Sequence, residues 1–283
     1  MIPKLIDPAD ISLVCKDFET RYEERRPASG VTVNQKEDGE FGVLASEQFR
    51  NIENLPFDAS PAINLIALHP ELIRLAREAL QTEHVHLYQA HSWAKFTGDA
   101  DYDQHFHCDF SNHTLTVPSD EERLRTINFV IYVTDVSNDL GALHYVSHGE
   151  SDPITGLNRP PIPAAEQQKA LKRHERSGAA PAGSVFAYGI DLYHRGTNLT
   201  RPGGRRFSFF ASYKAQGNDM IGWTAWPVTH REPWHLVIEQ ATPDQLSCLG
   251  IPPPGDAFWT ERTLARTAAR WPGLELAPYC AAL

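Results

Sequence analysis

The sequence predicts a mainly β (α+β) protein, in which an antiparallel, double-stranded β core is buttressed by helices at its N- and C-terminal ends. Short runs rich in β-branched and aromatic residues dominate the middle of the chain, from about residue 85 to residue 215. Apolar residues at helical spacing occur mainly outside that stretch. Strands in the middle and helices at both ends favour a barrel-like or sandwich-like core with helices packed against it.

The individual elements follow in order along the chain. Residues 27–54 are polar and contain several glycines, so we expect a long surface loop or lid there. Apolar residues recur at helical spacing over 70–80, and the period then changes to that of a strand over 85–96. Further strands are predicted at 105–110, 126–134, 142–147, 184–188 and 206–213, and further helices at 164–176, 242–248 and 258–271. Because no stretch resembles a linker, residues 1–283 are expected to form a single domain.

Composition places limits on function. The 283 residues include 41% hydrophobic residues, enough for a packed core, and carry a formal charge of −10. So acidic a chain is not expected to bind nucleic acid or an anionic membrane surface. No run is apolar enough to span a bilayer, the N-terminus lacks the apolar core of a secretory signal, and the cysteines have no CxxC spacing. A cytoplasmic protein with reduced thiols is therefore expected.

The stretch QHFHCDF, residues 104–110, contains candidate metal ligands. His105, His107 and Asp109 occupy alternate positions, so on an extended strand their side chains point the same way. Iron sites of the two-histidine, one-carboxylate type bind three ligands on one face of the ion and leave the other positions open. His107 and Asp109 fit two of these ligands. We interpret His105 as a pocket-lining histidine, because a catalytic site needs its open positions.

The third ligand is expected to be a histidine on a later strand. Of the histidines after Asp109, His194 differs from the others in its surroundings. It follows a strand-like run, precedes a Gly-Thr-Asn turn, and is followed by Arg205 and Arg206 at the start of the next predicted strand. The planar guanidinium of an arginine suits a carboxylate-bearing cosubstrate bound beside the metal.

Three motifs occur in a fixed order along the chain. They are HCD at 107–109, GALHYVSHG at 141–149 and HRGTNLTRPGGRRF at 194–207. Together they resemble the phytanoyl-CoA dioxygenase-like family of non-haem iron(II), 2-oxoglutarate-dependent oxygenases. The stretch YQAHSWAKF at 88–96 is also similar to the strand that precedes the HxD motif in that family. The resemblance covers about residues 85–215, and the ordered set is far more specific than HxD alone.

The resemblance implies a double-stranded β-helix core, a cupin-like jelly roll, that binds Fe(II) through His107, Asp109 and His194. It also implies 2-oxoglutarate as the cosubstrate and O2 as the oxidant, with release of succinate and CO2. The expected reaction is hydroxylation of an unactivated carbon of a small organic molecule. Halogenating relatives have a small residue in place of the carboxylate ligand, so the presence of Asp109 argues against halogenation.

The resemblance also points to residues around 2-oxoglutarate. In the family, an arginine shortly after the distal histidine pairs with the far carboxylate of 2-oxoglutarate, and here either Arg205 or Arg206 has that place. Arg206 is favoured because Ser208 and Ser212 would share its side of the strand, and Arg205 is the alternative. The further candidate contacts of the cosubstrate are Gln89, Lys95, Thr126 and Asn128. Trp93 would share a strand face with Gln89 and Lys95.

A different function is also compatible with a histidine and carboxylate cluster. A cupin-like protein could bind a divalent metal ion without 2-oxoglutarate-dependent oxygenase activity. Such a protein needs no anchor for a cosubstrate carboxylate, so the arginine pair that follows His194 weighs against it. The sequence leaves open the identity of the small-molecule substrate, the choice between hydroxylation and desaturation, and the oligomeric state.

Overall fold

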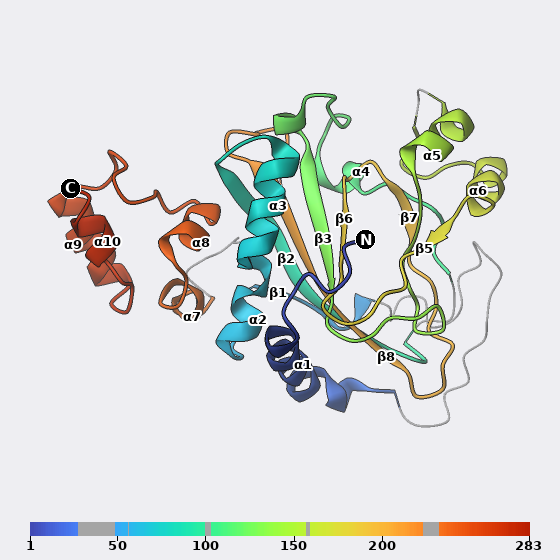
Figure 1. Cartoon of the computed structure of the whole chain (residues 1–283), viewed down its shortest axis with the longest axis horizontal. Coiled ribbons are helices and arrows are strands. Elements are labelled where there is room, and N and C mark those ends of the chain that lie inside the picture. Colours follow the sequence, from blue (N-terminus) through green and yellow to red (C-terminus); the bar gives the residue numbers. More distant parts are fainter. Residues whose placement is uncertain (28–48, 56, 100–102, 157–158, 223–231) are drawn as a thin grey trace.

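The structure, a computed structural model, is built around two antiparallel β-sheets (Figure 1). It describes residues 1–27, 49–55, 57–99, 103–156, 159–222 and 232–283. The large sheet has the strand order β1-β2-β8-β3-β6, and the small sheet has the order β5-β4-β7. The strands are β1 (Ile52–Asn54), β2 (Val85–Phe96), β3 (Thr126–Tyr132), β4 (His144–Val146), β5 (Arg176–Ser177), β6 (Val185–Tyr188), β7 (Tyr193–Arg195) and β8 (Arg205–Ala215). This is the jelly-roll α+β fold that the sequence predicts.

Helices surround the two sheets. Figure 1 shows α1 to α3 along the large sheet, α5 and α6 beside the small sheet, and α9 and α10 at the opposite end of the molecule from α5 and α6. The α-helices are α1 (Pro8–Tyr22), α2 (Pro61–Leu65), α3 (Pro70–Leu80), α4 (Phe110–His113), α5 (His148–Thr155), α6 (Ala165–Lys172), α7 (His235–Ile238), α8 (Pro243–Cys248), α9 (Glu261–Arg270) and α10 (Ala277–Cys280). Short 3-10 helices are η1 (Glu23–Arg25), η3 (Ile66–Leu68) and η4 (Glu122–Leu124). In the described part of the chain, none of the helices has the length and apolar character needed to cross a membrane.

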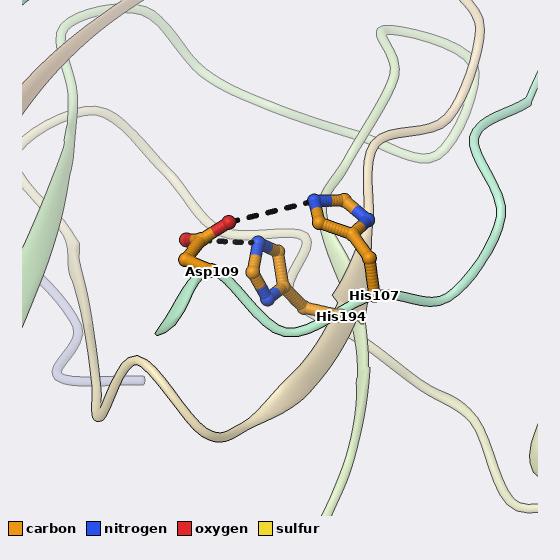
Figure 2. Close-up of side chains that lie close together, drawn as sticks. All are labelled: His107, Asp109 and His194. Atoms are coloured by element: carbon orange, nitrogen blue, oxygen red, sulfur yellow. Dashed lines mark ion pairs between the residues drawn. The ribbon is translucent and has the colours of Figure 1, made fainter. Parts of the chain in front are cut away.

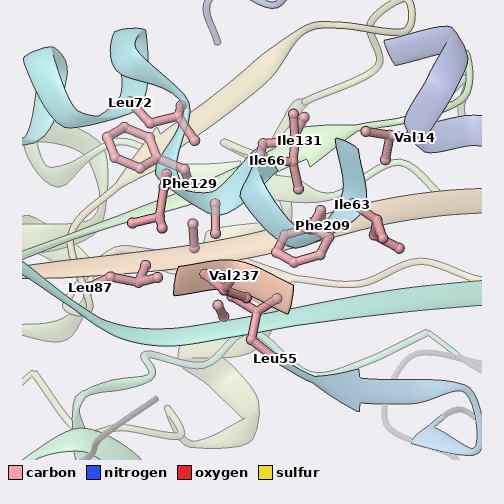
Figure 3. Packing of buried hydrophobic residues seen from close by; sticks show 14 of the residues in the cluster. Val14, Leu55, Ile63, Ile66, Leu72, Leu87, Phe129, Ile131, Phe209 and Val237 are labelled. Carbon is pink, nitrogen blue, oxygen red and sulfur yellow. The ribbon is translucent and has the colours of Figure 1, made fainter. Parts of the chain in front are cut away.

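The outer face of the large sheet forms the main hydrophobic core with α1, α2 and α3 (Figure 3). The sequence of β8 explains this arrangement, because alternate side chains of a strand point to opposite faces. Phe207, Phe209 and Tyr213 are fully buried against the helices. Burial of one such aromatic side chain contributes roughly 1.5–3 kcal/mol to folding. The intervening residues of β8 are left to face the other side of the sheet.

Helix α3 supports β3 and β8 from behind and has recognisable ends. Pro70 lies in its first turn, and His69 Nδ1 accepts a hydrogen bond from the backbone N–H of Glu71 at 3.2 Å. At the other end Gln81 adopts a left-handed conformation, with φ of 49°, which stops the helix. The buried stripe between these ends consists of Leu72, Ile73, Ala76 and Leu80.

Most predicted elements are present. The helix at 70–80 and the strand at 85–96 occur with the predicted bounds, as α3 and β2. The other strands predicted after residue 125 correspond to β3, β4, β6 and β8, with ends that differ by at most two residues. The helices predicted at 164–176, 242–248 and 258–271 correspond to the shorter α6, α8 and α9. Residues 28–48 of the predicted loop at 27–54 lie outside the described residues, and the loop prediction is wrong for Ile52–Asn54, which pair with β2 as strand β1.

The strand predicted at 105–110 is wrong. Within residues 103–110, all of which the structure describes, only His107 makes a β-bridge, and its partner is His194 of β7. Asp109 has helical backbone angles, with φ of −80° and ψ of −14°, and lies directly before α4. The segment does not continue as a strand because its other edge meets a loop, where the N–H of Cys108 donates to the carbonyl of Pro161 at 2.8 Å.

Candidate metal centre

The side chains of His107, Asp109 and His194 point toward one another (Figure 2). Their candidate ligand atoms all lie within 4.8 Å of one another. His107 Nε2 is 3.6 Å from Asp109 Oδ1, and His194 Nε2 is 3.5 Å from Asp109 Oδ2. Within the described ranges, no other group of three histidine, cysteine or acidic side chains is close enough to hold a metal ion. The structure therefore brings together the three residues that the sequence suggested as ligands.

The two histidines are neighbours because their backbones pair. The N–H of His107 donates to the carbonyl of His194, the N–H of His194 donates back to the carbonyl of His107, and both distances are 3.0 Å. The ring centroids are 4.6 Å apart. This bridge, with the N–H of Gln104 that donates to the carbonyl of Gly196 at 2.9 Å, attaches the segment that carries His107 and Asp109 to β7 of the small sheet and its end.

Hydrogen bonds to the backbone set the orientation of both imidazole rings. His107 Nδ1 lies 2.9 Å from the carbonyl oxygen of His105, and His194 Nδ1 lies 3.0 Å from that of Leu192. A carbonyl oxygen only accepts, so each Nδ1 carries a proton, and Nε2 is the ring nitrogen of each histidine that is directed toward Asp109. Burial, together with the neighbouring His194, lowers the pKa of His107 and favours the neutral ring. This is the protonation state that a metal ligand requires.

Asp109 is held as a carboxylate. Burial alone would raise its pKa, but His194, His107 and the hydroxyl of Tyr188 outweigh that effect and lower it. The hydroxyl of Tyr188, at the end of β6, donates to Asp109 Oδ2 at 3.1 Å. Two imidazoles and one carboxylate on one side of a point are the ligand set typical of non-haem iron(II) sites. The donor set therefore fits such an ion.

A glutamine holds the segment before the ligands in place. Gln168 of α6 is buried, with 8% of its surface exposed. Its Oε1 accepts from the N–H of Phe106 at 2.9 Å, and its Nε2 donates to the carbonyl of Phe106 at 2.8 Å. These two bonds are those that a neighbouring strand would make, so the amide stands in for a missing strand. On the same segment Gln104 Oε1 accepts from the N–H of Gly196 at 2.9 Å.

The three candidate ligands open into a cavity of about 610 Å³ lined by both sheets. Its floor is the inner face of the large sheet, with residues of β1, β2, β8 and β3. Among the described lining residues, the acidic and the always-cationic side chains are Asp109 and Arg206. The other lining residues include aromatic and uncharged polar side chains: Phe49, Asn54, Gln89, His91, Trp93, Asn112, Ser208, Phe210 and Ser212.

Arg206 faces this cavity and Arg205 does not. Arg206 is buried, with 6% exposed, and burial lowers the pKa of its guanidinium. It donates to the carbonyl of Gly141, and its Nε has no hydrogen-bond partner among the described residues. Arg205 lies on the opposite face of β8, where it forms ion pairs with Glu19 at 2.5 Å and Glu23 at 3.4 Å. The geometry thus favours Arg206 as the residue available to an anion inside the cavity.

Lys95 and Gln89 lie on the same side of the large sheet as Arg206. Lys95 is directly opposite Arg206 across the β2–β8 pair and is 4% exposed. Burial, with the neighbouring charge of Arg206, lowers the pKa of Lys95 to about 7. Its Nζ lies 5.2 Å from the ring centroid of Trp93, which lines the cavity. Gln89 also lines the cavity, and its Oε1 accepts from the hydroxyl of Ser212 at 3.1 Å.

The structure does not bring every candidate to the cavity. Asn128 is buried behind the lining, where its Oδ1 accepts from the hydroxyl of Tyr88 at 3.4 Å. Thr126, at the far end of β3, lines a different hollow together with Asp191. His105, the third member of the alternate pattern, lies outside the described lining because the chain does not form a regular strand there.

Two residues that help to build the centre were missed in the sequence. Tyr188 ends the strand predicted at 184–188, and a polar side chain on that strand's inner face was the available signal. Gln168 lies three residues before the buried Leu171, on the inward stripe of α6, where a polar residue is unusual. Neither position reveals its partner, because Asp109 and Phe106 are far away along the chain.

Comparison with known proteins places this geometry in context. The sequence model of the family described as phytanoyl-CoA dioxygenase (PhyH) matches residues 3–207 of the chain. Among solved structures, the chain is similar to the non-heme alpha ketoglutarate dependent carbocyclase SnoK from nogalamycin biosynthesis, with 15% identity and a TM-score of 0.50 over 75% of this chain and 77% of that chain. It is also similar to the epimerase SnoN in complex with Fe3+, alpha ketoglutarate and nogalamycin RO, with 18% identity and a TM-score of 0.50 over 76% and 77% of the two chains. At these identities the likeness concerns the fold. No curated protein matches the sequence.

Proposed function

The chain belongs to the phytanoyl-CoA dioxygenase family, and on that premise we propose that it is an Fe(II)- and 2-oxoglutarate-dependent oxygenase that oxidises a small organic molecule. One observation carries the proposal. A single cavity holds both a group of two histidines and one carboxylate and a buried guanidinium, Arg206, that has no acidic partner among the described residues. The first feature matches the iron, and the second matches the far carboxylate of 2-oxoglutarate.

His107, Asp109 and His194 would hold Fe(II). The backbone carbonyls that fix each Nδ1 proton keep both Nε2 atoms directed at the same point, and Tyr188 orients the carboxylate of Asp109. When bound, the metal supplies the activation of O2 that couples decarboxylation of 2-oxoglutarate, to succinate and CO2, with oxidation of the substrate. The protein's own task is to present three fixed ligands and to leave the cavity side open.

Arg206 would bind the far carboxylate of 2-oxoglutarate, with Lys95 as a second positive charge and Gln89 as a polar neighbour. A buried cation without a counter-ion is costly, so an anion that binds beside it recovers much of that cost. Arg205 is not needed for this role, because Glu19 and Glu23 already neutralise it on the other face of β8.

Hydroxylation is the outcome that we propose. The carboxylate of Asp109 occupies the place that a halide would need in a halogenating relative. The two similar solved structures carry the names of a carbocyclase and an epimerase, so product analysis rather than fold decides between outcomes. A single domain over residues 1–283 and a cytoplasmic location stay predictions from the sequence.

Anaerobic titration of the metal-free protein with Fe(II) and then 2-oxoglutarate tests the proposal. We expect a weak visible charge-transfer band that requires both additions, and we expect His194→Ala to abolish it. His174→Ala is the matched control, because His174 is exposed just after α6 and does not line the cavity. Tight metal binding without a band at any 2-oxoglutarate concentration would instead support the cupin-like metal-binding protein.

A further inference from the structure

The cavity floor is divided into regions by strand register. Arg206 lies at one end of the floor, opposite Lys95, which is buried beside the cavity and is not one of its described lining residues, and His91 faces Phe210 further along the β2–β8 pair. The cationic end is the part that the proposed function assigns to 2-oxoglutarate. The remaining floor lies toward β1, the edge strand of the large sheet, where Asn54 pairs with His91. That side is the space left for a substrate.

Aromatic rings form a continuous row along this side. Phe49 stacks on Trp93 with centroids 5.6 Å apart, and Trp93 contacts Phe210 at 5.7 Å. Phe210 in turn stacks on His91 at 4.7 Å, with the ring planes only 8° apart. We call these four residues the ring wall. Because Phe49 is 54% exposed while the other three are partly buried, the ring wall leads from solvent into the cavity.

The ring wall is uncharged at neutral pH. Burial lowers the pKa of His91 to about 4, so its imidazole carries no charge near pH 7. The described lining offers Arg206 as its one arginine or lysine, at the end assigned to the cosubstrate. A polyanionic substrate such as an acyl-CoA would meet no further cation among these residues. An uncharged substrate is therefore favoured.

Carboxamides lie beside the ring wall. Asn54 on β1, Gln89 on β2 and Asn112 on α4 all line the cavity. No described residue makes a hydrogen bond to the side chains of Asn54 and Asn112, and the amide nitrogen of Gln89 is likewise unused in the described part of the chain. An amide both donates and accepts, as a hydroxyl group does, so these side chains match hydroxyl groups better than they match ions.

We propose that the substrate is an uncharged ring that carries several hydroxyl groups, of the glycosyl or cyclic-polyol class, packed on the ring wall and hydrogen-bonded to the neighbouring carboxamides. The C–H bonds on the face of such a ring are polarised by adjacent oxygens, so they are attracted to the negative faces of aromatic rings. This inference rests on the proposed function, because it assigns the other end of the cavity to 2-oxoglutarate.

The test uses the full-length protein loaded anaerobically with Fe(II) and 2-oxoglutarate. The probes are a panel of neutral methyl glycosides of gluco, galacto and manno configuration with methyl β-maltoside, and the comparison probes are 2-naphthol and decanoyl-CoA. We expect at least one glycoside to shift the charge-transfer band and, in air, to raise succinate release. A shift caused only by 2-naphthol or decanoyl-CoA, or by no probe at all, would overturn the inference.

A pair of matched variants ties the effect to the ring wall. Phe49→Leu removes an exposed ring that stacks on Trp93, and we expect the Kd of the active glycoside to rise about fivefold to tenfold. Phe258→Leu removes a ring of similar exposure, 49%, beside Trp259, and we expect no change in Kd. An equal Kd in wild type and Phe49→Leu would contradict the inference. If the band itself never forms with Fe(II) and 2-oxoglutarate, the proposed function fails first, and the inference fails with it.

Discussion

The large sheet and the segment that carries His107 and Asp109 are held in place by different means. β2 and β8 pair through a long backbone ladder, from Val85 opposite Ala215 to Phe96 opposite Arg205. The segment at 103–109 has a single β-bridge, between His107 and His194. Its remaining support combines isolated backbone bonds, from Gln104 to Gly196 and from Cys108 to Pro161, with side-chain contacts, above all from the amide of Gln168 and the carboxylate of Asp103. The cosubstrate half of the cavity thus lies on a continuous backbone ladder, whereas the metal half depends on isolated backbone bonds and on individual side chains.

The two kinds of support make the two halves sensitive to different substitutions. On the ladder a side chain is free to serve the cavity, because the backbone alone maintains the strand. In the metal half, a single polar side chain can determine where a ligand lies. Replacing a polar residue outside the cavity should therefore disturb the position of the metal ligands. Replacing a residue on the inner face of the β2–β8 ladder should instead weaken ligand binding and leave folding intact.

The largest effect is expected when the ion pairs beside His194 are broken. Arg195 of β7, 3% exposed, forms ion pairs with Glu175 at 2.9 Å and with Asp103 at 3.0 Å. We expect Arg195→Met to lower the free energy of unfolding by about 3 kcal/mol, because it leaves two partly buried carboxylates without their cationic partner. Arg201→Met is the control, since the pair between Arg201 and Asp139 is half exposed and should contribute less than about 1 kcal/mol. Urea unfolding measures both values.

The same ion pairs predict a pH dependence. Burial alone would raise the pKa of Glu175, but His144 and Arg195 lower it from 4.5 to about 2. A lowered carboxyl pKa stabilises the fold above pH 4.5, and that contribution is lost as the pH falls from 4.5 through about 2. Arg195→Met should therefore lose less stability than wild type across this window. Parallel acid unfolding curves for the two proteins would show that the lowered pKa of Glu175 does not depend on Arg195.

A large but local effect is expected on the ladder side. Arg206→Met should raise the Kd of 2-oxoglutarate about a hundredfold, because a charge-assisted hydrogen bond to the far carboxylate is lost. The ligand-free variant should be at least as stable as wild type, because burial already disfavours the cation of Arg206. Titration of the charge-transfer band and thermal unfolding measure the two quantities. Arg205→Met, on the opposite face of β8, should leave the Kd unchanged, and an equal loss in both variants would refute the assignment.

The same contrast explains what the sequence could predict. The position of strand β8 was predicted because its apolar residues alternate with Arg206, Ser208 and Ser212. The pattern favoured the face of Arg206 as the inner one but left that of Arg205 as the alternative, and the structure places Arg206 inward. The bounds of β2 and α3 were likewise predicted, because long elements carry many periodic positions. Paired strands and amphipathic helices thus produce a periodic pattern of apolar residues that can be recognised in the sequence.

The metal half left a weaker trace. The alternate spacing of His107 and Asp109 and the surroundings of His194 suggested the three candidate ligands, and the motif resemblance supported them. The structure brings them together even though the strand expected around the first two is absent. Gln168 and Tyr188 could not be assigned, because their partners Phe106 and Asp109 are chosen by tertiary packing and not by spacing along the chain. Side-chain contacts between distant segments leave no period to read.

The smallest effect expected, and the sharpest test of side-chain support, concerns Gln168. Gln168→Leu keeps the size of the side chain but removes both hydrogen bonds to the peptide of Phe106, next to His107. We expect the Kd of Co(II), measured by its visible absorption, to rise about tenfold, as is typical when a group that orients a ligand is lost. The free energy of unfolding should fall by about 1–3 kcal/mol, because the buried N–H and carbonyl groups of Phe106 lose their partners.

Gln167→Leu separates positioning from general stability. Gln167 lies next to Gln168 on α6, but its amide accepts from the N–H of Ala164 and donates to the carbonyl of Ile154, both at 3.2 Å. In the described part of the chain, it makes no hydrogen bond to residues 103–109. This variant should lose stability without raising the Kd of Co(II). If both variants raise the Kd of Co(II) equally, α6 supports the metal half only through its overall stability. If Gln168→Leu alone raises that Kd, one side-chain amide takes the place of a strand beside His107. The metal half then depends on a single side chain, whereas β2 and β8 are held together by their backbones.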